Sequence, residues 1–145
     1  MKKLFTFLAL TISFSINAQM DDNSENTSAT GSHAVAMGKS TTASGGFSTA
    51  MGGDSTASGD YSVAMGRNTT ASGEISTTMG RETTASDYAS FVIGQYNSSG
   101  SSVTNNATSF NTANTAFVIG NGTASNAKSD AFKVMFNGDA TVSND

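Results

Sequence analysis

The side chains that perform catalysis or hold metal ions are few in this chain of 145 residues. It has one histidine, His33, and no cysteine, so neither a multi-histidine site nor a Cys-ligated metal can form. Its repeated carboxylates fall at predicted bends, no base or nucleophile recurs beside them, and no Gly-Gly-x-Gly-x-Asp calcium repeat occurs. We therefore expect no enzyme, no cofactor and no metal site. The carboxylates concerned are Asp54, Asp60, Glu74, Glu82 and Asp87.

A recurring pair of hydroxyl side chains offers a different kind of chemistry. A Thr-x-Ser pair returns every 14 residues, and its alternation with small residues predicts that both hydroxyls point outward from a half-exposed strand. Regular hydroxyl grids resemble those of ice-binding β-solenoids, although Thr also simply suits exposed strands. The predicted outward hydroxyl array comprises Thr42, Ser44, Thr56, Ser58, Thr70, Ser72, Thr84 and Ser86.

The composition indicates a repetitive, exported chain rather than an ordinary globular domain. Charged residues make up 12% of the sequence and aromatic residues 8%, whereas globular domains contain about 25% charged residues. Residues 1–18 have a basic start, an apolar stretch from Leu4 to Phe14 and a small final residue, Ala18, before Gln19. This arrangement is typical of a secretory signal peptide.

Export changes the charge of the mature protein. Loss of Lys2 and Lys3 from the seven basic residues leaves five against 11 acidic residues, a formal charge of −6. A mildly acidic chain of this kind is unsuited to nucleic acid or to an anionic membrane surface. No second long apolar stretch follows, so we expect no transmembrane segment in the mature chain.

A 14-residue repeat organises the sequence after the leader. Met-Gly pairs, and finally an Ile-Gly pair, begin at residues 37, 51, 65, 79 and 93. Turn residues are spaced too closely for a helix, so each unit predicts two short strands and two tight turns. The four complete units are SHAVAMGKSTTASG (32–45), GFSTAMGGDSTASG (46–59), DYSVAMGRNTTASG (60–73) and EISTTMGRETTASD (74–87).

Such units stack as the coils of a parallel β-solenoid, in which equivalent residues lie about 4.8 Å apart. Gly38 and its equivalents are then expected at one corner, where the backbone needs positive φ or close approach. His33 takes the place that Phe47 and Tyr61 occupy in later units, so we expect it to fill an end coil.

The longer strand of each unit avoids charge on both faces, which predicts that both faces are buried. One coil can cover only one face, so the other must meet another chain or stand in water as an apolar patch. About five coils also make a small core for a lone chain. We therefore expect obligate association through an interface and core ladder of Val35, Met37, Phe47, Met51, Tyr61, Val63, Met65, Ile75, Met79, Phe91 and Ile93.

The units also resemble a known family. Ser62-Val63-Ala64-Met65-Gly66 and Thr69-x-Ala71-x-Gly73 match the pattern N-S-V-A-I-G-x-x-S-x-A-x-G of the head repeat of YadA-like trimeric adhesins, with Met for Ile and Thr for Ser. The resemblance covers residues 26–97. It implies an all-β, left-handed parallel β-roll that assembles as a homotrimer on a Gram-negative surface and mediates attachment.

The chain divides accordingly into a signal peptide (1–18), a linker (19–25), head repeats (26–97), an inserted loop (98–114) and a terminal β segment (115–145). In the terminal segment, Phe117-Val118-Ile119-Gly120 echoes residues 91–94, and alternating apolar residues precede an Asn137-Gly138 turn that predicts a hairpin. This segment resembles the one that follows head repeats in fibre-like surface proteins of Bacteroidetes-type bacteria, where it leads into a stalk or a fibre tip.

The functional hypothesis is an adhesin head, at the cell surface or outer membrane or secreted, that binds through a multivalent trimer. The expected partners are further copies of the chain and an extracellular ligand or surface that the sequence does not specify. Two alternatives remain open: a ligand-free spacer within a surface fibre, and an ice-binding solenoid that uses the hydroxyl array.

Overall fold

The computed structural model of the protein describes residues 20–21, 25–98 and 106–143. The predicted signal peptide lies outside these residues. The described residues form strands, turns and loops, and none belongs to a helix, so the predicted all-β class is confirmed. In this part of the chain there is accordingly no helix of the length and apolarity needed to cross a membrane.

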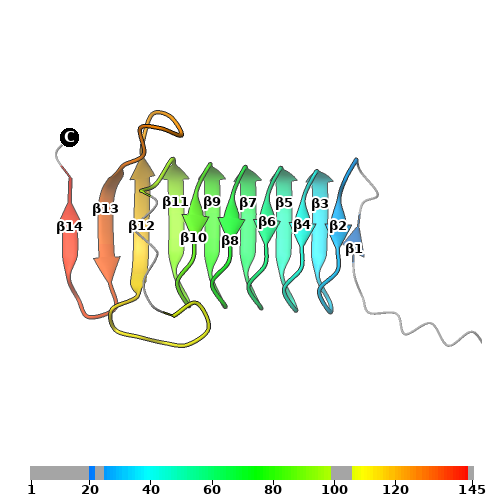
Figure 1. Ribbon diagram of the computed structural model, residues 1–145, viewed down its shortest axis with the longest axis horizontal. Helices are drawn as coiled ribbons and strands as arrows, with labels where there is room; N and C mark the ends of the chain where they lie inside the picture. The colour runs from blue at the N-terminus through cyan, green and yellow to red at the C-terminus, as the bar shows by residue number, and fades with distance from the viewer. Residues whose placement is uncertain (1–19, 22–24, 99–105, 144–145) are drawn as a thin grey trace, which may run out of the picture.

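Two strands in every 14 residues build a roll, as the repeat predicts (Figure 1). A five-residue strand is followed by a two-residue strand, and the chain then turns back into the next coil. The five-residue strands are β3 (Val35–Lys39), β5 (Thr49–Gly53), β7 (Val63–Arg67), β9 (Thr77–Arg81) and β11 (Phe91–Gln95). The two-residue strands are β2 (Ser28–Ala29), β4 (Thr42–Ala43), β6 (Thr56–Ala57), β8 (Thr70–Ala71) and β10 (Thr84–Ala85).

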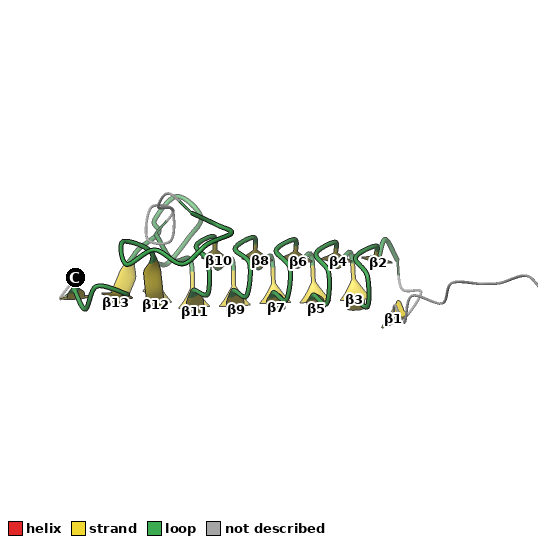
Figure 2. Cartoon of the chain, turned by 90° about the horizontal axis from the view of Figure 1, so that it is seen from below, coloured by secondary structure: helices red, strands yellow, loops and turns green. Residues whose placement is uncertain are grey.

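Each strand of the repeat pairs in parallel with its equivalent one coil away, so that Met51 faces Met65 and Thr56 faces Thr70. This pairing confirms the predicted parallel β-solenoid. We call the sheet ordered β1-β3-β5-β7-β9-β11-β12-β13-β14 the long sheet, and the sheet ordered β10-β8-β6-β4-β2 the short sheet. Seen from below, the strands of the two sheets form two rows, with the short-sheet strands above the long-sheet strands in the picture (Figure 2).

The long sheet extends beyond the short sheet at both ends. Phe117 lies opposite Phe91 and Gly120 opposite Gly94, so β12 adds in register to β11 in parallel. β13 and β14 follow in antiparallel, joined by a turn in which the Gly138 N–H donates to the Met135 carbonyl. The strands concerned are β12 (Thr115–Asn121), β13 (Asp130–Met135), β14 (Ala140–Val142) and, beside β3, β1 (Met20–Asp21).

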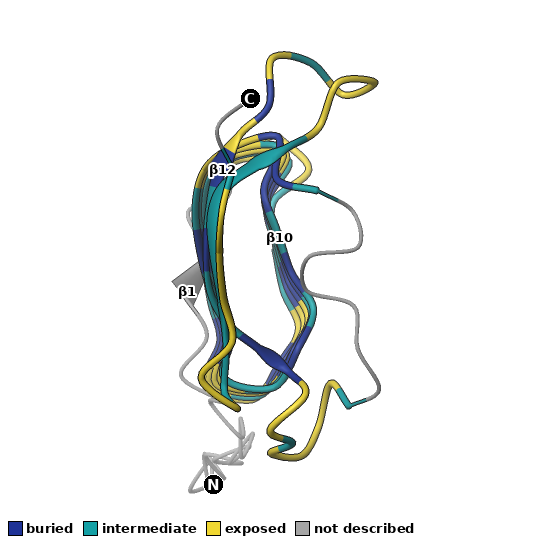
Figure 3. Ribbon diagram, turned by 90° about the vertical axis from the view of Figure 1, so that its left-hand side faces the viewer, coloured by how far each residue is buried: buried dark blue, intermediate teal, exposed yellow. Residues whose placement is uncertain are grey.

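The interior between the sheets holds mainly small side chains. Ala50 of the long sheet and Ala57 of the short sheet are fully buried, and their equivalents stack along the roll. Hydroxyls share this space: Thr78 Oγ1 donates to Thr83 Oγ1 at 2.6 Å. Looking down the roll, the two walls enclose a narrow interior (Figure 3). Methyl groups bury little apolar area, so each coil gains little hydrophobic stabilisation from its own core.

Among the residues that the structure describes, three interior hydroxyls have no hydrogen-bond partner: Thr41 Oγ1, Ser48 Oγ and Ser62 Oγ. Ser90 is equivalent to Ser48 and Ser62 in the last coil, and its hydroxyl donates to the Asp87 carbonyl at 2.8 Å. The first coil carries the fully buried Ala34 there. The position therefore accepts a methyl group, and an unpaired hydroxyl in it costs about 1–3 kcal/mol of desolvation.

Close contact between coils explains the glycine at the end of each Met-Gly pair. Gly66 has a φ of 131°, and a Cβ on it would lie 2.0 Å from the Gly80 carbonyl oxygen in the next coil. The same column of positive-φ glycines runs from Gly38 to Gly94. It lies at the corner that the repeat predicts.

Two side chains close the short sheet at β10. Asn97 acts as a substitute for a neighbouring backbone: the Thr84 N–H donates to Asn97 Oδ1 at 2.8 Å, and Asn97 Nδ2 donates to the Thr84 carbonyl at 3.1 Å. Asp87 stands where the previous coil has Gly73, at which a Cβ would lie 2.1 Å from the backbone oxygen of the following coil. The Asp87 carboxylate accepts a hydrogen bond from the Thr115 N–H at 2.7 Å.

Replacing Gly66 by alanine is expected to lower the free energy of unfolding by about 3 kcal/mol or more, because the methyl group meets a backbone oxygen at a positive-φ position. Gly53→Ala is the matched control, since a Cβ there has nothing within 4 Å. Its effect should stay within about 0.5 kcal/mol. Urea unfolding of both variants measures the difference, and equal midpoints would contradict the contact.

Ser62→Ala is expected to stabilise the roll by about 1 kcal/mol, because it removes a buried hydroxyl that has no partner. Ser90→Ala should do the reverse and destabilise by about 1 kcal/mol, because it deletes the hydrogen bond to the Asp87 carbonyl. Thermal unfolding compares the two variants with the parent protein. A fall in stability for Ser62→Ala would show that the hydroxyl is paired in solution.

Candidate interaction surface

The outer face of the long sheet carries most of the predicted apolar ladder. In β7, Val63 and Met65 flank the buried Ala64, so they lie on the other side of the sheet, where they are half-buried. Register pairing stacks the methionines of β3, β5, β7 and β9 in one column. We call this surface the outer ladder; its members on the repeat strands are Val35, Met37, Met51, Val63, Met65, Met79, Phe91 and Ile93.

The outer ladder continues on strands that do not belong to the repeat. The rings of Phe91 and Phe117 stack with centroids 5.7 Å apart, and Phe132 of β13 meets Phe117 edge-on at 6.1 Å. Ile119 lies opposite Phe132, and Val134 lies opposite Phe117. These residues were not among those predicted to form the ladder. Phe117 and Ile119 could have been predicted from the similarity of residues 117–120 to residues 91–94. Phe132 and Val134 could not, because β13 is antiparallel and has no periodic signal.

Three residues predicted to belong to the ladder do not lie on the outer face of the long sheet: Phe47, Tyr61 and Ile75. They sit in the turns that lead into β5, β7 and β9, with φ of 57°, 57° and 60°. Their exposed fractions are 52%, 55% and 46%. His33, at φ 58°, starts the same column, and the rings of His33, Phe47 and Tyr61 stack at 4.8 and 5.1 Å. We call these four residues the corner strip.

The predicted hydroxyl array lies on the outer face of the short sheet. Thr56 and Ser58 flank the buried Ala57, and the other coils repeat this alternation. The array is therefore on the opposite side of the roll from the outer ladder. Its members are half-buried or exposed: Thr42, Ser44, Thr56, Ser58, Thr70, Ser72, Thr84 and Ser86.

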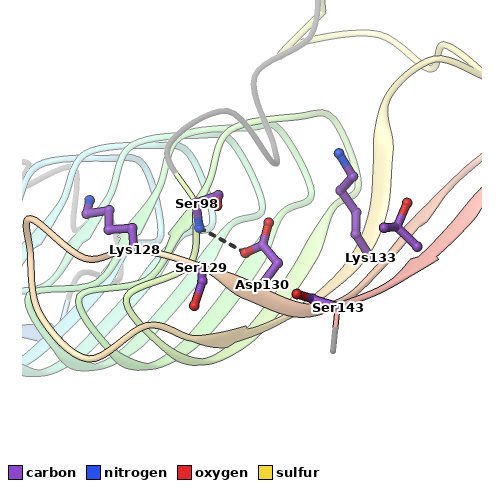
Figure 4. Close-up of a pocket in the computed structure, with 7 residues that line it drawn as sticks. Ser98, Lys128, Ser129, Asp130, Lys133 and Ser143 are labelled. Carbon is purple, nitrogen blue, oxygen red and sulfur yellow. Dashed lines mark hydrogen bonds between the residues drawn. The ribbon is translucent and has the colours of Figure 1, made fainter. Parts of the chain in front are cut away.

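A polar hollow of about 360 Å³ lies at the C-terminal end of the roll (Figure 4). Asp130 is fixed there, because its Oδ1 accepts a hydrogen bond from the Ser98 N–H at 2.8 Å. The hollow could not be predicted from the sequence, because its walls come from separate segments with no shared spacing. They are Ser98, Lys128, Ser129, Asp130, Lys133, Thr141 and Ser143.

Titratable side chains are dispersed over the roll. Within residues 20–21, 25–98 and 106–143, no three His, Asp or Glu side chains come together as a metal site requires. The exposed His33 has its Nδ1 2.8 Å from Ser32 Oγ, in a hydrogen bond. Asp60 Oδ1 accepts from the Gly46 N–H at 2.8 Å. These groups satisfy local backbone and side-chain partners rather than converging on one point.

A comparison with protein families agrees with the coil geometry. The model of the YadA head domain repeat, described as two copies, matches residues 29–55, 44–69 and 57–77. The chain carries YadA head domain repeats. Searches of curated proteins and of solved structures give no significant match.

YadA heads are structural adhesin domains of trimeric autotransporters, which Gram-negative bacteria expose at their surface. The YadA match covers coils from β2 to the start of β9. β11 extends the same coil geometry beyond the matched residues, since Phe91 to Gln95 pair in register with β9. Residues 29–77 thus consist of repeats of the kind found in adhesin heads.

Proposed function

We propose that the protein is a surface adhesin head that works as a homotrimer, with the three outer ladders packed around a common axis. The observation that supports this proposal is the outer ladder itself. Its side chains are half-buried Val, Met, Phe and Ile, with Thr49 and Thr77 between them, and it continues from β3 to β13. A lone roll would leave this column facing water, and contiguous apolar surfaces of that kind mark interaction sites.

The small core supports the same assembly. Because the interior is built largely of Ala, Ser and Thr, one roll buries little apolar surface on its own. Cyclic association uses the same face of every copy, so one apolar column per chain is enough to close a trimer. The cations Lys39, Arg67 and Arg81 lie exposed at the strand ends, outside the apolar centre.

The proposed attachment uses the face of the roll that remains exposed to solvent in such a trimer. The short sheets then face solvent, and each presents the hydroxyl array. Three copies of one rigid surface engage a ligand together, so weak individual contacts give strong retention. We propose host matrix, cells or a solid substrate as the target. The regularity of the array keeps ice binding as a second candidate.

Met65→Asp is expected to convert a trimer into monomers, because three carboxylates would meet at a desolvated axis. Ser58→Asp is the matched control: it places the same charge on the outer face of the short sheet, and it should leave the mass unchanged. Sedimentation equilibrium of the mature protein measures the outcome. A parent protein that sediments as a monomer would refute the proposed assembly.

Trimer formation should also raise adsorption. We expect the parent head to be retained on matrix-coated or cell-covered surfaces at least about 100-fold more strongly than Met65→Asp, since avidity is lost with the trimer. Solid-phase binding of the two proteins at equal chain concentration measures this. A trimer that binds no better than an unrelated protein would favour a spacer, and thermal hysteresis in cold solution would favour ice binding.

A further inference from the structure

The polar hollow of Figure 4 lies where the short sheet has ended. The short sheet stops at β10, whereas the long sheet goes on through β12, β13 and β14. Asn97 closes the short sheet, and the next residue, Ser98, lines the hollow. In the part of the chain that the structure describes, the inner faces of β13 and β14 therefore have no short-sheet strand opposite them.

A lysine takes a place in the interior column of the long sheet. Val92 lies opposite Val118, and Val118 lies opposite Lys133. Residues that are neighbours in register point to the same face of a sheet, and Val92 and Val118 are fully buried in the roll. Lys133 therefore projects from the inner face, where it is half-buried, and its cross-strand neighbour Thr141 continues the column. Both residues line the hollow.

Most of the unpaired polar groups of the hollow can donate hydrogen bonds. Lys128 and Lys133 form no ion pair among the described residues, and no hydrogen bond there engages the hydroxyls of Thr141 and Ser143. Asp130 supplies the single carboxylate. Its Oδ1 already accepts a backbone hydrogen bond, and its Oδ2 has no partner in the same part of the chain. The hollow thus offers two ammonium groups and two hydroxyls as donors, and one carboxylate oxygen as an acceptor.

The hollow is positive although the protein as a whole is acidic. Two of the five cations that remain after loss of residues 1–18 line it, against one carboxylate, whereas the mature chain has a formal charge of −6. Lys39 and Arg81 have partners elsewhere: Lys39 pairs with Glu25 at 3.3 Å, and Arg81 lies 5.2 Å from the ring centroid of Tyr96. A concave site lined by one sign of charge raises the local concentration of ligands of the opposite sign.

We propose that the hollow binds an acidic sugar, a pyranose ring that carries a carboxylate or a sulfate. The Lys133 ammonium and the hydroxyls of Thr141 and Ser143 bind the anionic group, and Asp130 Oδ2 accepts a hydrogen bond from a ring hydroxyl. Lys128 stands on the other side of Asp130 (Figure 4), where it attracts a neighbouring acidic residue of the same glycan. This inference rests on the proposed adhesin function, for which it names the class of ligand.

The mixture of charges favours an acidic sugar over a bare anion. Inorganic sulfate or phosphate would find Lys133 and the hydroxyls, but it would be repelled by the Asp130 carboxylate. A sugar brings hydroxyl donors for that carboxylate together with an anionic group for the lysine. The volume of about 360 Å³ is at the lower end of the range for small-molecule sites. It suits one ring rather than a folded partner.

The hollow stays accessible in the proposed trimer. Phe132 and Val134 lie opposite Ile119 and Phe117 and continue the outer ladder, whereas Lys133 points to the other face of β13. A trimer closed through the outer ladders therefore leaves three hollows facing outward. A glycan with several acidic residues would engage them together, which strengthens retention.

The test is a titration of the mature protein followed by backbone-amide NMR. Methyl β-D-glucuronide is the carboxylate probe and methyl β-D-galactoside 6-sulfate is the sulfate probe. We expect saturable shifts at Lys133, Thr141 and Ser143 with at least one of them, and the probe that binds identifies the anionic group. Methyl β-D-galactoside, inorganic sulfate and acetyl-glutamate amide should each bind about tenfold more weakly or worse. No saturable shift with either acidic sugar, or equal affinity for sulfate or acetyl-glutamate amide, would overturn the proposal.

Three variants locate the site. Lys133→Gln should weaken binding of the acidic sugar about tenfold or more, because a charge-assisted hydrogen bond is lost. Lys128→Gln, on an exposed loop, should weaken it about two- to fivefold. Lys39→Gln is the matched control: it removes the same charge from an exposed ion pair outside the hollow and should leave the affinity unchanged. Unchanged affinity in Lys133→Gln would refute the site. If Lys133→Gln fails to fold, Lys128→Gln still gives a loss or no loss.

The result is separable from the proposed assembly. The hollow is built within one chain, so Met65→Asp should bind the acidic sugar with the affinity of the parent protein. A parent that sediments as a monomer and still binds would refute the trimer and support the hollow. A trimer that adsorbs to surfaces but shows no shifts with either acidic sugar would overturn the hollow and leave the adhesin function in place.

Discussion

The short distance between neighbouring coils determines which residues can occupy the corner of each coil. Parallel backbone ladders hold each coil against the next so closely that Gly66 has no room for a methyl group beside the Gly80 carbonyl. Between the two sheets, the interior columns are largely Ala, Ser and Thr. A roll built this way is regular and thin, and its larger apolar side chains are left on outer surfaces: on the long sheet, at the corner, and on the strands that follow the repeat.

These outer surfaces differ in character. The outer ladder lies on strands, where alternation places Met65 opposite to Ala64, and it is continuous with Phe117 and Phe132 beyond the repeat. The corner strip lies in turns and is held there by a strained backbone. A continuous flat apolar column suits a copy of itself, whereas the corner strip is a narrow ridge of exposed rings and Ile75 in turns.

Much of the fold could be predicted from the sequence, because each coil of a solenoid corresponds to one repeat of the sequence. The interval between Met-Gly pairs gave the coil length, and parity within the long strand separated Met65 from Ala64. Parity could not place Phe47, because a left-handed residue turns the chain and ends the alternation before β5 begins. Nor could it reveal that the loop carbonyls of Asn106 and Ala107 accept hydrogen bonds from Tyr88 N–H and Glu74 N–H, because that loop has no period.

The side-chain amide of Asn97 has an effect on how the protein behaves at high concentration. Stacked coils of identical geometry can continue from one molecule into another, which is the route to fibrils. By completing the Thr84 backbone with a carboxamide, Asn97 presents an incoming coil with a blunt, already paired end. Molecules at high surface density therefore do not add to one another through this end of the short sheet. The length of the short sheet stays fixed by the number of units encoded in the sequence.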